Sequence, residues 1–186
     1  QENIFLKKGS GEFEKFYQDF KLSLENYTPI QKNSIHAVVD NFDSDTQMLL
    51  VHNTLTKEEE VEFMENWNEN IFWVTCPNAN LYIENRLPEY KSFLNHNASI
   101  CIGTDSLSSN WQLSIWEEIK TIVRYNSWLK PEILFEWATL NGAKFLTVDN
   151  QFGSVEEGKN PGLNLITNFD FPKMHLSETS QIKVLC

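Results

Sequence analysis

The sequence has 186 residues, of which 41% are hydrophobic and 13% aromatic, which is enough apolar material for one sizeable core. Its formal net charge is −11, with 26 acidic residues against 15 basic ones. A charge of this sign repels phosphate backbones and anionic lipid, so we expect neither a nucleic-acid partner nor a membrane partner. No apolar run in the sequence reaches the length of a membrane span.

The three cysteines, Cys76, Cys101 and Cys186, have no C-x-x-C spacing between any two of them. This argues against a disulfide framework and against a thiolate zinc cluster. We expect buried, reduced cysteines in a cytoplasmic protein. The first residue is Gln1 and not Met, which we interpret as a processed chain or a fragment.

Apolar residues at helical spacing, such as Phe13, Phe16 and Phe20, predict an amphipathic helix over about 11–25. A second short helix is predicted over 34–42. Compact apolar runs follow, typical of parallel strands that are buried on both faces. They lie at residues 47–51, 71–76 and 98–102.

Helical patterns separate these runs, one opened by a capping box with Thr56 as the cap and Glu59 three residues on. The other predicted helices lie at 89–94, 111–125 and 131–146. Alternating strands and helices with short connections predict an α/β fold with a parallel sheet, as a barrel or a doubly wound sheet. Beyond residue 150 the pattern favours short antiparallel strands at 153–155, 163–166 and 182–185, with a turn at Glu157-Gly158.

Polar residues follow each predicted parallel strand, namely His52, Asn80 and the pair Asp105-Ser106. Catalytic groups of a parallel α/β barrel lie at these strand ends. A histidine and an aspartate there suit a divalent metal and its bound water. Each residue also has a structural alternative, since His52 can be a satisfied structural histidine and Asp105 can cap the next helix.

The order of these motifs resembles the amidohydrolase superfamily, in the branch of the S-adenosylhomocysteine, guanine and aminofutalosine deaminases and the triazine chlorohydrolases. Three segments resemble its sixth to eighth barrel strands, and two later ones resemble its A-T-x-N-G-A helix and its G-x-I-x-x-G-K return. They are Leu50-Val51-His52-Asn53, Cys76-Pro77-x-x-Asn80, Ile102-Gly103-Thr104-Asp105-Ser106, Ala138-Thr139-Leu140-Asn141-Gly142-Ala143 and Gly153-Ser154-Val155-Glu156-Glu157-Gly158-Lys159.

The resemblance implies an α/β fold in which residues 1–150 are the C-terminal half of a TIM (β/α)8 barrel. Residues 151–186 would then be strands of a small β-sandwich domain. The family's H-x-H metal pair is absent, and Gln1-Glu2 matches only the end of its fifth-strand H-x-x-E motif. We therefore expect four barrel strands, an inserted helical segment at about 9–45, and a polypeptide that is inactive and binds metal poorly by itself. Asn160-Pro161-Gly162-Leu163 replaces the family's A-D-L after Lys159.

The resemblance also implies roles for single residues. Asp105 would bind the metal and take a proton from the metal-bound water, and His52 would hydrogen-bond that water. Glu2 would protonate a ring nitrogen of the substrate. Asn80 and Ser106 would contact substrate or support the site, with simple capping as the alternative. The implied cofactor is one divalent ion, with zinc preferred over iron.

The implied function is hydrolytic deamination of an adenine-like nucleoside or another amino-substituted ring, with aminofutalosine-type nucleosides preferred. Dechlorination or hydrolysis of another C–N bond on the same scaffold is an alternative. A non-catalytic interaction module is a second one, and a homodimer is an open possibility.

Other conspicuous residues are interpreted as structural. His36, His96 and His175 are expected at the surface. Glu117 and Glu118 are expected on a solvated face or in an internal ion pair. The tryptophans are expected in the core rather than in a base-stacking platform. They are Trp67, Trp73, Trp111 and Trp116.

Overall fold

The computed structural model describes residues 1–170 and 172–185, apart from the side chain at position 38. These residues divide into two compact units, Gln1–Thr46 and Gln47–Cys186. Cys76 and Cys101 are buried and free, as predicted. Cys186, which was also predicted to be buried, lies outside the described residues.

The first unit is helical and is held together by aromatic side chains. Phe5 is buried and stacks on Tyr27 at a centroid distance of 4.5 Å, and the Tyr27 hydroxyl donates a hydrogen bond to the Phe5 carbonyl at 3.1 Å. The helix predicted over 11–25 is shorter, because the backbone turns to positive φ at Lys21. The first helix was not predicted, and it ends at Gly9 in the left-handed conformation. The helices are α1 (Glu2–Lys8), α2 (Glu12–Asp19) and α3 (Ser34–Val39).

The second unit contains the predicted parallel sheet, in the order β1-β2-β3. The strands are β1 (Met48–Val51), β2 (Ile71–Thr75) and β3 (Ser99–Ile102), and each lies within or at the edge of a predicted apolar run. In β2 the side chains are buried in four of five positions, which explains why the run lacks polar alternation. The described residues form three parallel strands, not the four that we expected.

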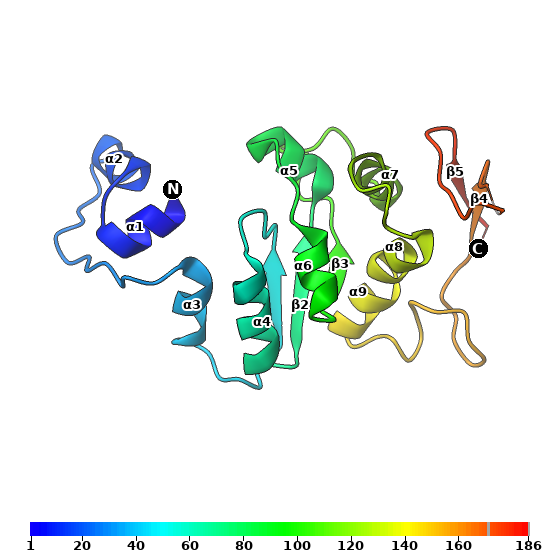
Figure 1. The fold of residues 1–186 in the computed structure, drawn as a ribbon, viewed down its shortest axis with the longest axis horizontal. Helices are drawn as coiled ribbons and strands as arrows, with labels where there is room; N and C mark the ends of the chain where they lie inside the picture. The colour runs from blue at the N-terminus through cyan, green and yellow to red at the C-terminus, as the bar shows by residue number, and fades with distance from the viewer. Residues whose placement is uncertain (171, 186) are drawn as a thin grey trace. The chain divides into compact units, whose positions relative to one another are not determined.

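Helices α4 (Glu58–Trp67) and α6 (Tyr90–Asn95) lie in front of this sheet in Figure 1. The predicted capping box at α4 is displaced by one residue, because the Glu60 carboxylate accepts the backbone N–H of Lys57 at 3.0 Å. On α6, Phe93 is buried and packs edge-on against Trp73 of β2 at 5.1 Å between centroids. These contacts anchor the centre of the sheet to its helical layer.

The remaining helices differ from the predictions at their ends. Sequence reading missed α5 (Pro77–Glu84), which begins directly after β2 with Pro77 at its first position. The helix predicted over 111–125 starts later, at α7 (Ile115–Tyr125), where the Ser114 hydroxyl accepts the N–H of Glu117. Trp111 therefore lies outside the helix and is 64% exposed, so its assignment to the core was wrong.

The helix predicted over 131–146 is interrupted at Thr139, giving α8 (Pro131–Ala138) and α9 (Leu140–Phe145). Both helices contact β3. Trp73 and Trp116 are buried and Trp67 is partly buried, as expected. His175 is exposed, whereas His36 and His96 are only partly exposed.

The C-terminal residues form an antiparallel pair, β4 (Asn164–Thr167) with β5 (Gln181–Val184). The strand predicted at 153–155 was wrong, because Gly153 and Gly158 both adopt a φ of 87° and a polar turn lies between them. A Cβ on Gly153 would lie 2.7 Å from the Cβ of Ala143, so this glycine serves a close approach to α9. The division predicted at residue 150 stays a prediction.

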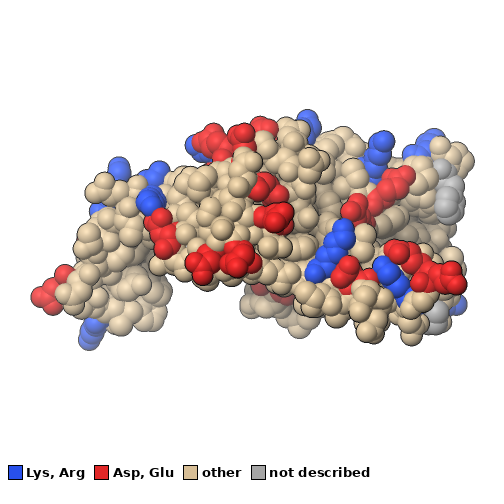
Figure 2. All heavy atoms as spheres, turned by 90° about the horizontal axis from the view of Figure 1, so that it is seen from below, with Lys and Arg blue, Asp and Glu red and all other residues tan. Residues whose placement is uncertain are grey.

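Charged side chains of both signs share the surface seen in Figure 2, where lysines and arginines lie scattered among acidic residues. One exposed pair joins α7 to the C-terminal segment, since Arg124 donates two hydrogen bonds to Glu178 at 2.8 and 2.9 Å. Among the described residues, the helices are too short or too polar to cross a bilayer.

Candidate active site

Three parallel strands end at one edge of the sheet, and a predicted site residue follows each of them. His52 comes directly after β1, Asn80 lies in the first turn of α5 after β2, and Asp105 follows β3. Because parallel strands present their carboxyl ends together, the fold gathers residues that are far apart in the chain. In the structure, His52 lies beside both Asn80 and Asp105.

His52 and Asn80 are joined by a hydrogen bond of 2.8 Å between the imidazole Nδ1 and the amide Oδ1. In this arrangement Nδ1 carries the proton and donates it, which leaves Nε2 facing away from Asn80. Asn80 is only 3% exposed, and its Nδ2 has no hydrogen-bond partner among the described residues. Burying an amide group without a hydrogen-bond partner costs free energy. We therefore infer that Asn80 occupies this buried position because its Oδ1 orients His52.

Asp105 lies on the other side of the imidazole, with 3.9 Å between His52 Nε2 and Asp105 Oδ2. The Ser109 hydroxyl donates to the same carboxylate oxygen at 2.7 Å. This bond is the main reason why the pKa of Asp105 is lowered, and the Ser106 backbone and His52 act in the same direction against desolvation. The site therefore keeps Asp105 ionised and partly open to solvent.

Both residues have unusual backbone conformations. The φ angle is 73° at His52 and 56° at Asp105, within the left-handed region. Non-glycine residues seldom adopt it, although His, Asn and Asp tolerate it better than most. Strained backbone of this kind persists where surrounding contacts hold it, and it is concentrated at functional sites.

The remaining predicted site residues are less well connected. Ser106 is exposed and its hydroxyl contacts Ser108 at 2.5 Å, while its carbonyl accepts the N–H of Ser109. Its role stays a prediction. Glu2 is an exposed residue in the first turn of α1, within the first compact unit, and its catalytic role also stays a prediction.

Sequence reading missed a buried polar cluster behind this edge. Glu118 was predicted on a solvated face or in an ion pair, but it is 0% exposed and accepts hydrogen bonds from Asn78 and Asn110. Its helical position was a usable signal, because Glu118 lies four residues before the buried Ile122 and so shares its inward face. Burial raises the pKa of Glu118, and the hydrogen bonds partly offset this effect.

A nucleophilic cysteine does not fit this site. Cys76 caps α5 and is buried, and desolvation, with the charges of Asp105 and Glu118, raises the pKa of its thiol to about 12. A thiol with this pKa is almost wholly protonated at neutral pH and is a poor nucleophile.

A complete metal site is not present in the described part of the chain, where no three His, Cys, Asp or Glu side chains converge. Asp105, with a carboxylate that is partly exposed, can offer one hard oxygen ligand. One carboxylate beside one histidine does not hold a catalytic ion, which normally takes three protein ligands. These residues therefore fit part of a metal site and no more.

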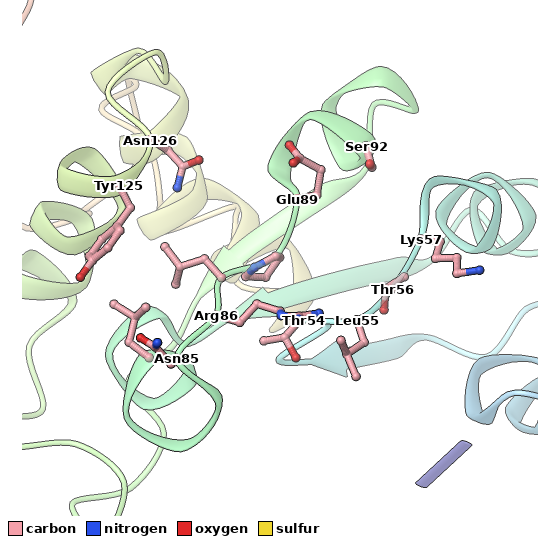
Figure 3. A pocket seen from close by; sticks show the side chains of 13 residues that line it. Thr54, Leu55, Thr56, Lys57, Asn85, Arg86, Glu89, Ser92, Tyr125 and Asn126 are labelled. Carbon is pink, nitrogen blue, oxygen red and sulfur yellow. The ribbon is translucent and has the colours of Figure 1, made fainter. Parts of the chain in front are cut away.

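An open groove of about 740 Å³ lies next to the strand ends, in the second unit (Figure 3). Its lining comes from the segment after β1, the end of α5 and the end of α7, and includes Thr54, Arg86 and Tyr125. Neither His52 nor Asp105 lines it. We therefore place the candidate chemistry at the strand ends and not in this groove.

A parallel α/β sheet with ionisable residues just beyond its strand ends is the arrangement of the barrel hydrolases. Comparison with known proteins agrees with this class. Residues 27–182 match the model of the Amidohydrolase family, and the chain belongs to this family.

Several relatives are deaminases. The chain is 28% identical over 188 residues to a protein from Helicobacter pylori called adenosine deaminase, covering 100% of this chain and 44% of that protein. It is 32% identical to an aminodeoxyfutalosine deaminase from Nitratiruptor, over 64% of this chain and 27% of that protein. The chain thus spans less than half the length of these curated relatives.

Solved structures show the same fold. The crystal structure of Helicobacter pylori aminofutalosine deaminase in complex with methylthio-coformycin superposes with a TM-score of 0.73 at 29% identity, covering 86% of this chain and 38% of that one. An adenosine deaminase from Xanthomonas campestris with bound zinc gives 0.68 at 18% identity over 94% of this chain and 43% of that one, a likeness of fold alone.

Proposed function

We propose that the protein is a hydrolytic deaminase of an adenine-like nucleoside, with aminofutalosine-type nucleosides as the preferred substrates. The observation that carries this proposal is the pair of His52 and Asp105, which come from different strand ends and lie 3.9 Å apart. The Helicobacter pylori structure supports the substrate class, because it is an aminofutalosine deaminase in complex with a coformycin.

In the proposed reaction, water adds to the ring carbon that carries the amino group, and ammonia leaves, so that a carbonyl replaces the amine. The Asp105 carboxylate accepts a proton from the attacking water, for which its lowered pKa keeps it ionised. His52, held by Asn80, orients the water and stabilises the tetrahedral centre. Glu2 protonates the adjacent ring nitrogen.

We propose that Asp105 also provides one ligand to a divalent ion, with zinc preferred and iron as the alternative. The described residues supply too few ligands for such an ion by themselves, and the chain spans less than half the length of its deaminase relatives. Such an ion would lower the pKa of a water bound to it towards neutrality.

For the fold, we propose that β1, β2 and β3 are consecutive strands of a (β/α)8 barrel over residues 1–150, and that 151–186 belong to a small β-sandwich. The parallel order β1-β2-β3 and the antiparallel β4–β5 pair support this division. Among the described residues of the second unit, β1 pairs with β2 alone and exposes Leu49 and Val51. We therefore expect residues 1–186 alone to be inactive and to bind less than one zinc per chain.

The test is ammonia release by the metal-loaded, full-length protein from aminofutalosine, adenine nucleosides, guanine and triazines. We expect turnover of adenine-like nucleosides, and a loss of kcat of about 10²- to 10⁴-fold in Asp105→Asn. Asp45→Asn, an exposed aspartate of the first unit, is the matched control and should keep full activity. No ammonia from any substrate with metal bound would exclude the deaminase, and release from triazines alone would favour the ring-hydrolase alternative.

A further inference from the structure

Glu118 of α7 is a buried carboxylate that forms no ion pair with any of the described residues. Its Oε2 accepts the backbone N–H of Asn78 at 2.8 Å, and its Oε1 accepts the side-chain amides of Asn78 at 2.9 Å and of Asn110 at 2.7 Å. Its side chain is 0% exposed. Burying a carboxylate that is bound only by uncharged donors costs free energy through desolvation. Packing alone does not explain such a residue, and a further role is expected.

The donors to Glu118 come from the two segments that carry the candidate site. Asn78 lies in the first turn of α5, two residues before Asn80, which contacts His52. Asn110 belongs to the segment after β3, and its Nδ2 also donates to the carbonyl of Thr104 at 2.7 Å. Thr104 directly precedes Asp105. One carboxylate on α7 is therefore linked to the backbone beside both site residues.

These links explain how Asp105 is held in its left-handed conformation. The peptide before it is fixed by Asn110, and its side chain is fixed by Ser109 at 2.7 Å. With both sides held, the strained φ of 56° is over-determined by its surroundings. If Asn110 is lost, the Thr104 carbonyl and the Glu118 carboxylate each lose a donor, and the segment is free to relax.

The hydrogen-bond pattern also specifies a carboxylate. All three contacts to Glu118 are donors, which an ionised carboxylate accepts on both oxygens. A glutamine would place an NH₂ against either the Asn78 N–H or the Asn110 amide, and two donors would face each other. Thr121 completes the cluster, since its hydroxyl donates to Asn78 Oδ1 at 2.7 Å.

We propose that Glu118 is a positioning residue, which acts through Asn110 and Asn78 to fix Asp105 and the Asn80–His52 pair in catalytic geometry. This inference rests on the proposed function of the same site. It assigns to α7 a part in the reaction through hydrogen bonds to the segments that follow β2 and β3.

The test compares Asn110→Ala with Asn141→Ala in the metal-loaded, full-length protein. The two asparagines are matched, because they are 5% and 6% exposed and each donates from Nδ2 to a carbonyl of the β3 segment. Asn141 binds Ile100 in the middle of the strand, whereas Asn110 binds Thr104 at the site. Asn110→Ala removes donors to Thr104 and Glu118, and Asn141→Ala removes the donor to Ile100, so we expect the larger loss of melting temperature in Asn110→Ala and compare kcat at a temperature where both variants are folded.

We expect Asn110→Ala to lower kcat by about 10- to 100-fold with KM changed less than threefold, and Asn141→Ala to keep kcat within threefold. Glu118→Gln, measured where it is at least 90% folded, should behave like Asn110→Ala. Equal losses of kcat in the two asparagine variants, or an unchanged kcat in Asn110→Ala, would overturn the proposal.

A second readout does not depend on turnover. In histidine-labelled full-length protein, the ring signal that disappears in His52→Gln should shift in Asn110→Ala and stay in place in Asn141→Ala. If the wild-type protein released no ammonia but this signal still shifted, the proposed function would fail while the positioning role held. An unmoved signal in Asn110→Ala would overturn the positioning role whatever the activity.

Discussion

Asn80→Leu is the substitution for which we expect stability and activity to change in opposite directions. Asn80 is 3% exposed, accepts one hydrogen bond from His52 at 2.8 Å, and keeps an unpaired Nδ2. Replacing it by an apolar side chain of similar size removes that bond, at a cost of about 1 kcal/mol. The same change removes a buried amide without a partner, a gain of about 1–3 kcal/mol.

The net effect should lie between about 0 and 2 kcal/mol of stabilisation, since His52 can replace the lost bond by water at its partly exposed ring. For a domain of this size, each kcal/mol raises the melting temperature by about 2–4 °C. Activity should move the other way, because the His52 imidazole loses the contact that fixes its orientation and tautomer. Loss of such a supporting contact typically costs about 10- to 100-fold.

The measurements are thermal unfolding and ammonia release in the full-length protein, with Asn68→Leu as the control. Asn68 is also 3% exposed, but its Oδ1 accepts the N–H of Asn70 at 2.7 Å at the end of α4. Its replacement should lower the melting temperature and leave kcat unchanged. A melting temperature of Asn80→Leu below that of wild type, or a kcat within threefold of wild type, would refute our account of Asn80.

Three further predictions concern the core around the site. Trp73→Phe removes the indole hydrogen bond to Glu65 at 2.7 Å and should cost about 2–3 kcal/mol. Burial raises the pKa of Glu65 and this bond lowers it, so its loss raises that pKa further. A carboxyl group with a raised pKa contributes stability at low pH that is lost as pH rises. The free energy of unfolding of the variant, measured by urea titration, should therefore fall further below that of wild type at pH 7 than at pH 4. With a pKa of about 12, only about 10⁻⁴ of the Cys76 thiol is ionised at pH 8, so peptide mapping after alkylation should find it modified only in unfolded protein. Gly103→Ala would place a Cβ 3.0 Å from Val74 Cγ1 and should lower the free energy of unfolding by about 1–3 kcal/mol, measured in the same urea titration.

The sheet could be predicted from the sequence because its signal is local. The runs at 47–51, 71–76 and 98–102 are mostly apolar on both faces, and a polar residue follows each of them, namely His52, Asn80 and Asp105. The same logic placed His52 and Asp105 at one edge, because parallel strands put their carboxyl ends together. The contact between them needed no information beyond strand order.

The errors lie where distant contacts or turn chemistry override a local pattern. The sequence around Trp111 fits a helix. However, the buried side chain of Asn110 donates a hydrogen bond to Glu118, and the helix starts only after Ser114. Gly153 was predicted to lie in a strand at 153–155, but its backbone approaches α9 and Val155 is 78% exposed. Neither contact is visible in a window of neighbouring residues.

The candidate site depends both on local sequence pattern and on turn chemistry. His, Asn and Asp are the non-glycine residues that best tolerate the left-handed region, and His52, Asn53 and Asp105 all adopt it directly beyond their strands. A chain that leaves a parallel strand through such a residue turns sharply, so the side chain stays at the sheet edge instead of following the chain away. The residue types needed for proton transfer are thus also those that make the turn possible. This physical coincidence explains why strand-end His and Asp are informative in the sequence, whereas Asn78 and Asn110, which do not make these turns, carry no such signal.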